Sequence, residues 1–239
     1  MLAAGGAGQT LELTPREMFY KPEQPSQPPK PKPKPPGPRR NGVKLIRVSA
    51  DQTPLGLKYA VVKVADQTEV PAGTLFHTGD HIQLRVEANA SGYLYIVNRG
   101  TSGDWKVLFP AATIDGGRNS VAGFRPVTLP SEKDQITFRN PPGVESLFIV
   151  LSRQPVSDLD RLIYSLKGDP ATLVAQAAID DPTIAGLRLS VRPRDLIVEP
   201  VTPGSSADAT GRQESATYVL SAPGSADSRL IADVQLKHQ

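Results

Sequence analysis

From residue 43 onwards, hydrophobic and polar residues alternate along much of the chain, which is the pattern of β-strands with one buried face. The clearest case is His81–Ala88, in which every second residue is apolar: Ile82, Leu84, Val86 and Ala88. Because successive side chains of a strand point to opposite sides, we expect these four side chains to lie together in the core.

Other runs rich in β-branched, aliphatic and aromatic residues predict further strands. They cover residues 43–48, 55–64, 93–97, 105–109, 125–129, 135–138, 146–151, 195–198, 217–220 and 230–236. Pro110 ends the run 105–109, because proline cannot donate a hydrogen bond to a neighbouring strand. The last run alternates again, so we expect it to pair with residues 217–220 in the same sandwich.

Helical patterns occur between the strands predicted at 146–151 and 195–198. Ser157 and the acidic residues after it are typical of a helix N-terminus, and apolar residues follow at helical spacing. Asp169 and Pro170 together are typical of a second N-terminus. These signals predict a helical insertion at about 157–180.

The fold class that follows is mainly β: an antiparallel immunoglobulin-like β-sandwich with one or two short helices inserted. We expect residues 43–239 to form this sandwich as a single domain, because short strands and turns recur through the whole of that stretch.

Residues 1–42 have a different composition and predict a disordered, proline-rich stalk. Ten of the 24 prolines lie between residues 15 and 38. Proline fixes φ and removes the amide donor, so this stretch is expected to form an extended polyproline II rod without packing of its own. Lysine and proline alternate over residues 30–35, and the segment resembles the periplasm-crossing region of TonB-type proteins.

Two shorter segments precede the rod. Residues 1–9 consist mostly of small residues, and we interpret them as the end of a signal peptide; a flexible cytoplasmic N-terminus is the alternative. Met18, Phe19 and Tyr20 then form an apolar cluster. This cluster is either a short peptide motif that docks elsewhere or a small apolar patch at the start of the mature chain.

Composition and charge exclude several classes of function. The net charge is +3, but residues 1–42 contain seven basic and three acidic side chains, so the remainder is close to neutral. The folded part therefore offers no surface for nucleic acid. The absence of cysteine excludes disulfides, thiolate metal sites and cysteine nucleophiles. No apolar run is long enough for a transmembrane helix.

Five blocks of sequence together resemble one family. They lie at residues 54–59, 76–82, 86–95, 107–110 and 147–153 and include Gly-Asp, Glu-Ala-Asn, Gly-Tyr-Leu-Tyr and Leu-Phe-Pro in that order. They are similar to the bacterial domain-of-unknown-function family 4384. The resemblance implies an exported or envelope β-sandwich module, periplasmic or extracellular, that is often joined to other domains and has no assigned catalytic residues.

No catalytic, cofactor or metal site is expected. His77 and His81 flank Asp80, but their spacing straddles a turn and they lack the convergent third and fourth ligands that zinc requires. Asp80 is instead expected to stabilise the turn by bonding to backbone. Nucleophile, phosphate-loop and dinucleotide motifs are absent from the sequence.

The best candidate for binding is the loop 99–105, with Arg99 and Asp104 at its base beside Trp105, the single tryptophan. Tyr93 and Tyr95 share one face of the preceding strand and are the other candidates. For the loop, the alternative is a plain hairpin with Trp105 buried. For the tyrosines, the alternative is core packing with a hydrogen-bonded hydroxyl.

These observations favour a non-catalytic interaction or structural module of the bacterial cell envelope. Its partner is expected to be another envelope protein or a domain of the same assembly. A carbohydrate- or peptidoglycan-binding module, with a glycan as partner, is the alternative, and an enzyme is less well supported. Exposure of Trp105 separates the first two hypotheses, because a sugar platform must present its ring to solvent.

Overall fold

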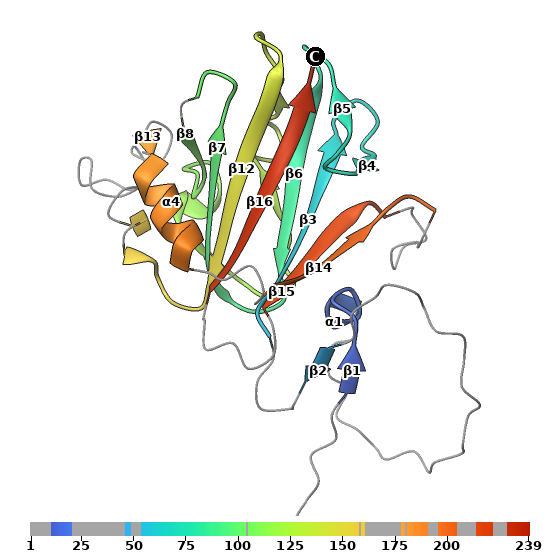
Figure 1. Ribbon diagram of the computed structural model, residues 1–239, viewed down its shortest axis with the longest axis vertical. Helices are drawn as coiled ribbons and strands as arrows, with labels where there is room; N and C mark the ends of the chain where they lie inside the picture. The colour runs from blue at the N-terminus through green and yellow to red at the C-terminus, as the bar shows by residue number, and fades with distance from the viewer. Residues whose placement is uncertain are drawn as a thin grey trace, which may run out of the picture.

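The computed structural model describes residues 11–20, 46–48, 54–103, 105–157, 159–160, 178–179, 181–190, 196–204, 214–221 and 229–239. These residues are mainly in strands, which form two sheets of seven strands each and one small pair, β1 with β2. The two large sheets pack face to face as a β-sandwich (Figure 1), as the sequence predicts.

One sheet, called here the β3 sheet, has the strand order β10-β6-β3-β15-β14, with β11 paired to β6 and β4 paired to β3. Its strands are β3 (Gly56–Lys63), β4 (Glu69–Val70), β6 (His81–Ala88), β10 (Val127–Leu129), β11 (Ile136–Thr137), β14 (Leu196–Val201) and β15 (Ala216–Ser221).

The other sheet, called the β12 sheet, has the order β13-β8-β7-β12-β16-β5, with β9 paired to β7. Its strands are β5 (Leu75–Phe76), β7 (Gly92–Arg99), β8 (Trp105–Phe109), β9 (Ser120–Val121), β12 (Gly143–Ser152), β13 (Ala178–Ile179) and β16 (Arg229–His238). A short 3-10 turn, Asp115–Gly117, lies between β8 and β9. Pairing is antiparallel in both sheets except between β16 and β5, which are parallel.

The last strand does not pair as predicted. β16 pairs with β12 along its whole length, from Arg229 opposite Ser152 to His238 opposite Gly143. β15, the expected partner, lies in the other sheet between β14 and β3. Alternation correctly indicated one buried face on β16, but a buried face does not identify which neighbouring strand supplies the hydrogen bonds.

The core between the sheets contains the side chains that alternation assigns to it. Ile82, Leu84, Val86 and Ala88 of β6 are all buried in the main cluster. Gln83 is buried as well, on the opposite side of the strand, where its amide nitrogen donates to the backbone carbonyls of Ser131 and Asp134. The inner core is therefore the part of the fold that follows most directly from the sequence.

The helices match the prediction only in part. Ser157, Leu159 and Asp160 are helical, and the Asp160 amide donates to the Val156 carbonyl at 2.8 Å, so a helix begins where expected. The predicted second N-terminus at Asp169 lies outside the described residues. β13 is a strand inside the predicted helical insertion, and α4 (Asp181–Ser190) is a helix that follows it.

The N-terminal segment contains structure that the stalk prediction lacks. β1 (Leu11–Leu13) pairs with β2 (Ile46–Val48), and α1 (Glu17–Tyr20) lies near β14 and β15 (Figure 1). The prediction that residues 1–42 do not pack is therefore wrong for residues 14–20. The boundary itself stays a prediction, because residues 1–10, 21–45 and 49–53 lie outside the described part of the chain. In that part, no helix is long and apolar enough to span a membrane.

Candidate functional site

The outer face of the β3 sheet, on the side away from the core, is apolar where β3, β14 and β15 lie side by side. On β15 the side chains of Ala216, Tyr218 and Leu220 point outward, whereas Val219 points into the core. Ala60 of β3 and Val201 of β14 extend the same surface. The outer face of an antiparallel sheet is usually polar, so an apolar one requires a cover or a partner.

Residues 14–20 cover this face. Met18 and Phe19 of α1 are 8% and 7% exposed and belong to the same apolar cluster. The Phe19 ring packs edge-on against Tyr218, with 5.3 Å between ring centroids, and against Phe124 at 6.3 Å. We call residues 14–20 the docking segment, and the apolar outer face of β3, β14 and β15 the docking face.

Local sequence explains why the docking segment forms a helical turn. The Glu17 amide donates to Thr14 Oγ1 at 3.2 Å, and the Thr14 amide donates to Glu17 Oε2 at 2.9 Å. This reciprocal pair is a capping box, and Pro15 occupies the first helical position, where a missing amide hydrogen does no harm. The Thr-Pro-Arg-Glu sequence before the apolar cluster was the signal that could have predicted α1.

A buried carboxylate holds the docking segment on the face. Glu214, just before β15, is 1% exposed. Its carboxylate oxygens accept hydrogen bonds from Arg16 Nε at 2.8 Å and from the Tyr20 hydroxyl at 2.7 Å. Lys58 Nζ lies 2.8 Å from the carboxylate, and the Tyr218 hydroxyl also donates to it. Two of these donors belong to the segment and two to the face, so Glu214 joins them.

The electrostatics of this cluster favour its charged form at neutral pH. Burial alone would raise the pKa of Glu214, but hydrogen bonds from Lys58, Tyr218 and Tyr20, with the charge of Lys58, lower that pKa to about 2. Burial also opposes the charge of Lys58, yet its bonds to Glu214 and Tyr20 raise the Lys58 pKa above its usual value. Burial and the bond to Glu214 raise the pKa of Tyr218, which stays a neutral donor.

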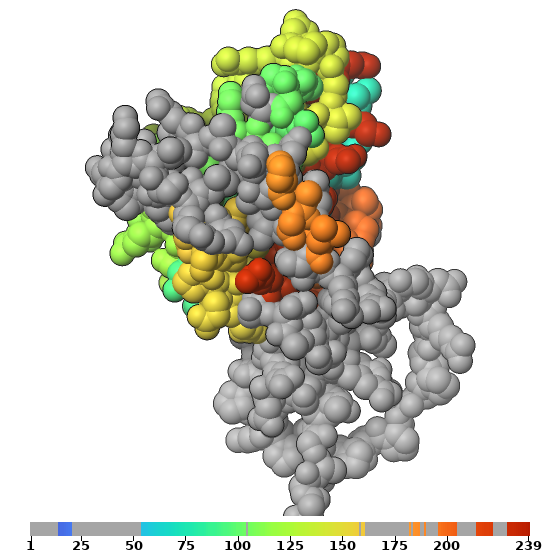
Figure 2. Space-filling model, turned by 60° about the vertical axis from the view of Figure 1, so that its left-hand side comes forward, coloured from blue at the N-terminus to red at the C-terminus, as the bar shows by residue number. Residues whose placement is uncertain are grey.

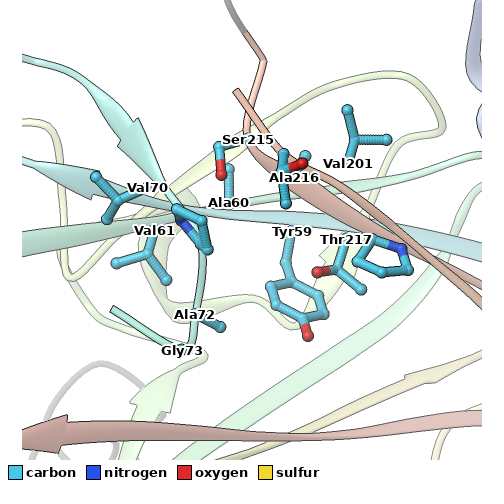
Figure 3. A pocket seen from close by; sticks show the side chains of 13 residues that line it. Tyr59, Ala60, Val61, Val70, Ala72, Gly73, Val201, Ser215, Ala216 and Thr217 are labelled. Carbon is cyan, nitrogen blue, oxygen red and sulfur yellow. The ribbon is translucent and has the colours of Figure 1, made fainter. Parts of the chain in front are cut away.

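A cavity of about 190 Å³ lies beside the docking face (Figure 3). β15 pairs with β3 as far as Thr217 opposite Tyr59, and β4 pairs with β3 from Val61 onwards. The cavity therefore lies at the point along β3 where pairing with β15 ends and pairing with β4 begins. Its lining is mostly apolar and includes Ala60 and Ala216. It also includes Ser215, 1% exposed, whose hydroxyl has no hydrogen-bond partner among the described residues.

The residues singled out in the loop after β7 lie elsewhere and do not form an exposed platform. Trp105 is 4% exposed and packs in a second outer cluster, on the β12 sheet, with Phe148, Val156 and Ile184. Arg99 lies over the Trp105 ring at 5.9 Å, and its Nε donates to the Gly103 carbonyl at 2.8 Å. Asp104 lies outside the described residues.

The two tyrosines of β7 pack into the same outer cluster. Tyr95 is 1% exposed; its hydroxyl donates to Asp160 Oδ1 at 2.7 Å and accepts from the Val156 amide at 3.0 Å. Tyr93 is partly buried at the edge of the cluster. The structure thus gives Tyr95 the packing role with a bonded hydroxyl, and it brings neither ring to the docking face.

The histidine turn has the structural role expected of it. The His77 amide donates to Asp80 Oδ2 at 2.9 Å, and the Asp80 amide donates back to the His77 carbonyl. His81 lies 3.0 Å from the Thr137 hydroxyl, across the β6–β11 pair. Among the residues that the structure describes, no three His, Asp or Glu side chains gather closely enough to hold a metal ion.

Comparison with known proteins identifies a family model that is similar to part of the chain. Residues 75–155 match a family model described as Domain of unknown function (DUF4384). No curated protein and no solved structure was found that matches the chain. The matched segment runs from β5 to just beyond β12, so the docking segment, Lys58 and Glu214 all lie outside it. Residues 75–155 are therefore similar to the DUF4384 family, and four of the five sequence blocks that indicated this family lie inside the match, whereas the block at residues 54–59 lies outside it.

Proposed function

We propose that the protein is a non-catalytic interaction module of the bacterial cell envelope, and that its docking face binds short peptide segments. The observation that carries the proposal is the pairing of Arg16 with Glu214, 198 residues apart in the sequence, at a fully buried carboxylate. A segment that only rested on the surface would need no such partner.

Three features suit the docking face to peptide recognition. The apolar cluster accepts Met18 and Phe19, Glu214 accepts an arginine and a tyrosine, and the capping box pre-forms the turn that presents them. Aromatic and arginine side chains dominate the affinity of protein interfaces, and a pre-formed turn lowers the entropy lost on binding. The preferred ligand is therefore a short helical turn that carries an aromatic residue and an arginine.

The docking segment is attached to the sandwich through residues 21–53, so it competes with any free peptide at an effective concentration of roughly millimolar. We propose that the segment occupies the face until a stronger segment displaces it, from another envelope protein or a domain of the same assembly. The proline- and lysine-rich residues 30–35 and the DUF4384 match support placement in the periplasm or outside the cell.

A glycan is less well supported as the partner. Trp105 is 4% exposed, so its ring cannot form the flat, open surface on which a sugar stacks. Catalysis is not proposed either. Glu214 has its pKa lowered to about 2 and is fully hydrogen-bonded, which makes it a poor proton donor or acceptor at neutral pH.

The proposal can be tested with the full chain and a labelled peptide of residues 10–21, using fluorescence anisotropy. In a Met18→Ser/Phe19→Ser variant the attached segment is disabled, so the face is free and should bind the peptide. The wild type should bind it much more weakly, because its own segment occupies the face.

Glu214→Gln in the disabled variant should weaken binding of the peptide by about 30-fold. A peptide with serine in place of Phe19 is the matched control and should not bind. The proposal fails if the disabled variant does not bind the wild-type peptide, or if Glu214→Gln leaves the affinity unchanged.

A further inference from the structure

A second cavity, of about 350 Å³, lies at the end of the sandwich where the β7–β8 loop faces the connection between β11 and β12. Figure 2 shows green atoms of the β7–β8 hairpin beside yellow-green atoms of that connection at the top of the molecule. Its lining residues all lie between 98 and 145, within the segment matched to DUF4384, and none of them belongs to the docking face.

Polar side chains occupy inward positions at this end, where the core would otherwise continue. On β7, Leu94 and Ile96 point into the core, and Asn98 is the next residue on that side. On β12, Leu147 points into the core, and Glu145 precedes it on the same side.

Lys106 of β8 lies directly opposite Asn98. Opposite residues of an antiparallel pair share a face, and Glu145 lies diagonal to Asn98 on the same face, because Leu147 is the residue opposite Asn98 on β12. A cation, an amide and a carboxylate therefore lie on one face of three adjacent strands.

Asn98 and Glu145 of the lining are called here the floor of the cavity, and Asn98 has a hydrogen-bond acceptor without a partner among the described residues. Asn98 Nδ2 donates to Glu145 Oε2 at 3.2 Å, and since a carboxylate only accepts, this bond fixes which way the amide points. Asn98 Oδ1 is then shielded from solvent and has no partner among the described residues. Glu145 itself is 8% exposed. Leaving a buried acceptor unpaired is unfavourable, so a donor at this place would be bound favourably.

The rim of the cavity has the opposite character. Lys106 and Arg139 are exposed cations, and the hydroxyls of Thr101 and Ser102 lie with them on the lining. Two neighbouring acceptors at the floor fit a charged group with several N–H donors, and cations at the rim fit a carboxylate. Among the described residues of the lining none is aromatic, so they offer a sugar ring no surface to stack on.

We propose that this cavity binds a small zwitterion of amino-acid size, with its ammonium group on Glu145 and Asn98 and its carboxylate towards Lys106 and Arg139. The volume lies near the lower end of the range for small-molecule sites, roughly 300–1,000 Å³. The site is separate from the docking face, and neither proposal depends on the other.

Titration of the isotope-labelled full chain, followed by NMR, tests the proposal. L-alanine, D-alanine and glycine are the probes; acetate and methylammonium each supply half of the ligand, and glucose supplies neither charge. At least one amino acid should give saturable shifts at the amides of residues 100–102 and 136–137. Acetate and methylammonium should each bind more weakly than that amino acid, and glucose should leave these amides unchanged.

Two substitutions should each weaken binding of the amino acid by about tenfold or more, because each removes a charged hydrogen-bond partner: Glu145→Gln at the floor and Lys106→Gln at the rim. Lys106 is exposed, so this variant keeps the fold even if Glu145→Gln does not. Glu132→Gln, an exposed carboxylate that does not line the cavity, is the control and should change nothing. The proposal is overturned if no probe gives saturable shifts, if glucose gives the same shifts, or if Lys106→Gln leaves the affinity unchanged.

Discussion

Both sheets of the sandwich have an apolar outer face, and each face is covered by a segment that is not part of its sheet, but the two covers are held differently. On the β12 sheet the cover includes Val156, Leu159 and Ile184, from the connection between β12 and β14 (Figure 1). On the β3 sheet the cover is Met18 and Phe19, from the docking segment.

The polar groups that accompany the two covers differ in charge. At the β12 sheet the carboxylate of Asp160 accepts from the neutral groups Tyr95 and Asn119. At the β3 sheet Glu214 is joined to two cations, Arg16 and Lys58.

The first cover is thus an integral part of the domain. We propose that the second is an attached ligand, held in part by the charges of Arg16, Lys58 and Glu214, that can leave without unfolding the sandwich. The comparison indicates that an apolar outer face of a sheet can serve either as a second hydrophobic core or as a binding site. Which of the two it is depends on whether the segment that covers it is a permanent part of the domain.

The largest expected effect is on the integral cover. Leu159 is 1% exposed, and Leu159→Ala should lower the free energy of unfolding of the whole domain by about 3 kcal/mol, since it leaves a cavity in packed surroundings. Chemical denaturation measures this. Phe19→Ala is the matched change on the other cover; it should release residues 14–20 and shift the unfolding midpoint much less. Equal shifts for the two variants would mean that both covers are core.

A smaller effect, confined to the docking segment, is expected from Glu214→Gln. It removes the charge that Arg16 and Lys58 share, and should weaken docking by about 2 kcal/mol, because both cations can regain water. Trypsin cleavage between Arg16 and Glu17 reports docking and should become about 30-fold faster. Glu132→Gln is the control at an exposed carboxylate. An unchanged cleavage rate in Glu214→Gln would show that Glu214 does not hold the segment.

Acid should weaken docking through the same residue. Against the effect of burial, hydrogen bonds from Lys58, Tyr218 and Tyr20 lower the pKa of Glu214 from its usual 4.5 to about 2, and of these donors only Tyr20 leaves with the segment. The pKa of Glu214 therefore rises when the segment leaves but stays below 4.5, so the contribution of its charge to docking is fully present above pH 4.5 and is lost as the pH falls towards 2. Binding of the labelled peptide to the Met18→Ser/Phe19→Ser variant, measured between pH 7 and 2, should decline over that window. Binding that is constant down to pH 2 would contradict the assignment.

The smallest effect is expected from Tyr20→Phe, which removes one of the donors to Glu214 and leaves Arg16, Lys58 and Tyr218 in place. Docking should weaken by about 1 kcal/mol, the usual net value of a single hydrogen bond. The trypsin assay measures this, too. If Tyr20→Phe weakened docking more than Glu214→Gln does, Tyr20 and not Glu214 would be the residue that contributes most to holding the segment.

The sequence predicted the inner core well because alternation depends only on which side of a strand is buried. His81–Ala88 and Trp105–Phe109 are strands with the bounds expected for them. The partner of β16 could not be predicted in the same way, because pairing depends on distant residues.

The docking site escaped prediction for a related reason. Glu214 and Lys58 are ordinary charged residues in the sequence, and only the fold brings them to Arg16. The proline content of residues 15–38 also led us to predict disorder for the whole segment, although Thr14 and Glu17 form a capping box at its start. Charge clusters joined by long-range contacts leave no local pattern, whereas a capping box does.

The coupling between Arg16 and Glu214 tests the central claim most directly. Trypsin cannot report docking here, because Arg16→Ala removes the cleavage site. A double-mutant cycle of Arg16→Ala, Glu214→Gln and the double variant would therefore be measured by competition with the labelled peptide. In each full-length variant the attached segment competes with the labelled peptide, so the apparent affinity of the peptide reports how firmly the segment docks. The labelled peptide contacts Glu214 as well, so Glu214→Gln also changes its own affinity. That change is measured separately in the Met18→Ser/Phe19→Ser variant, with and without Glu214→Gln, and is then subtracted. We predict a coupling energy of about 1 kcal/mol or more, in the range found for residues in direct contact. A coupling energy of zero would mean that the two side chains act independently, and that the docking segment is not held by Glu214.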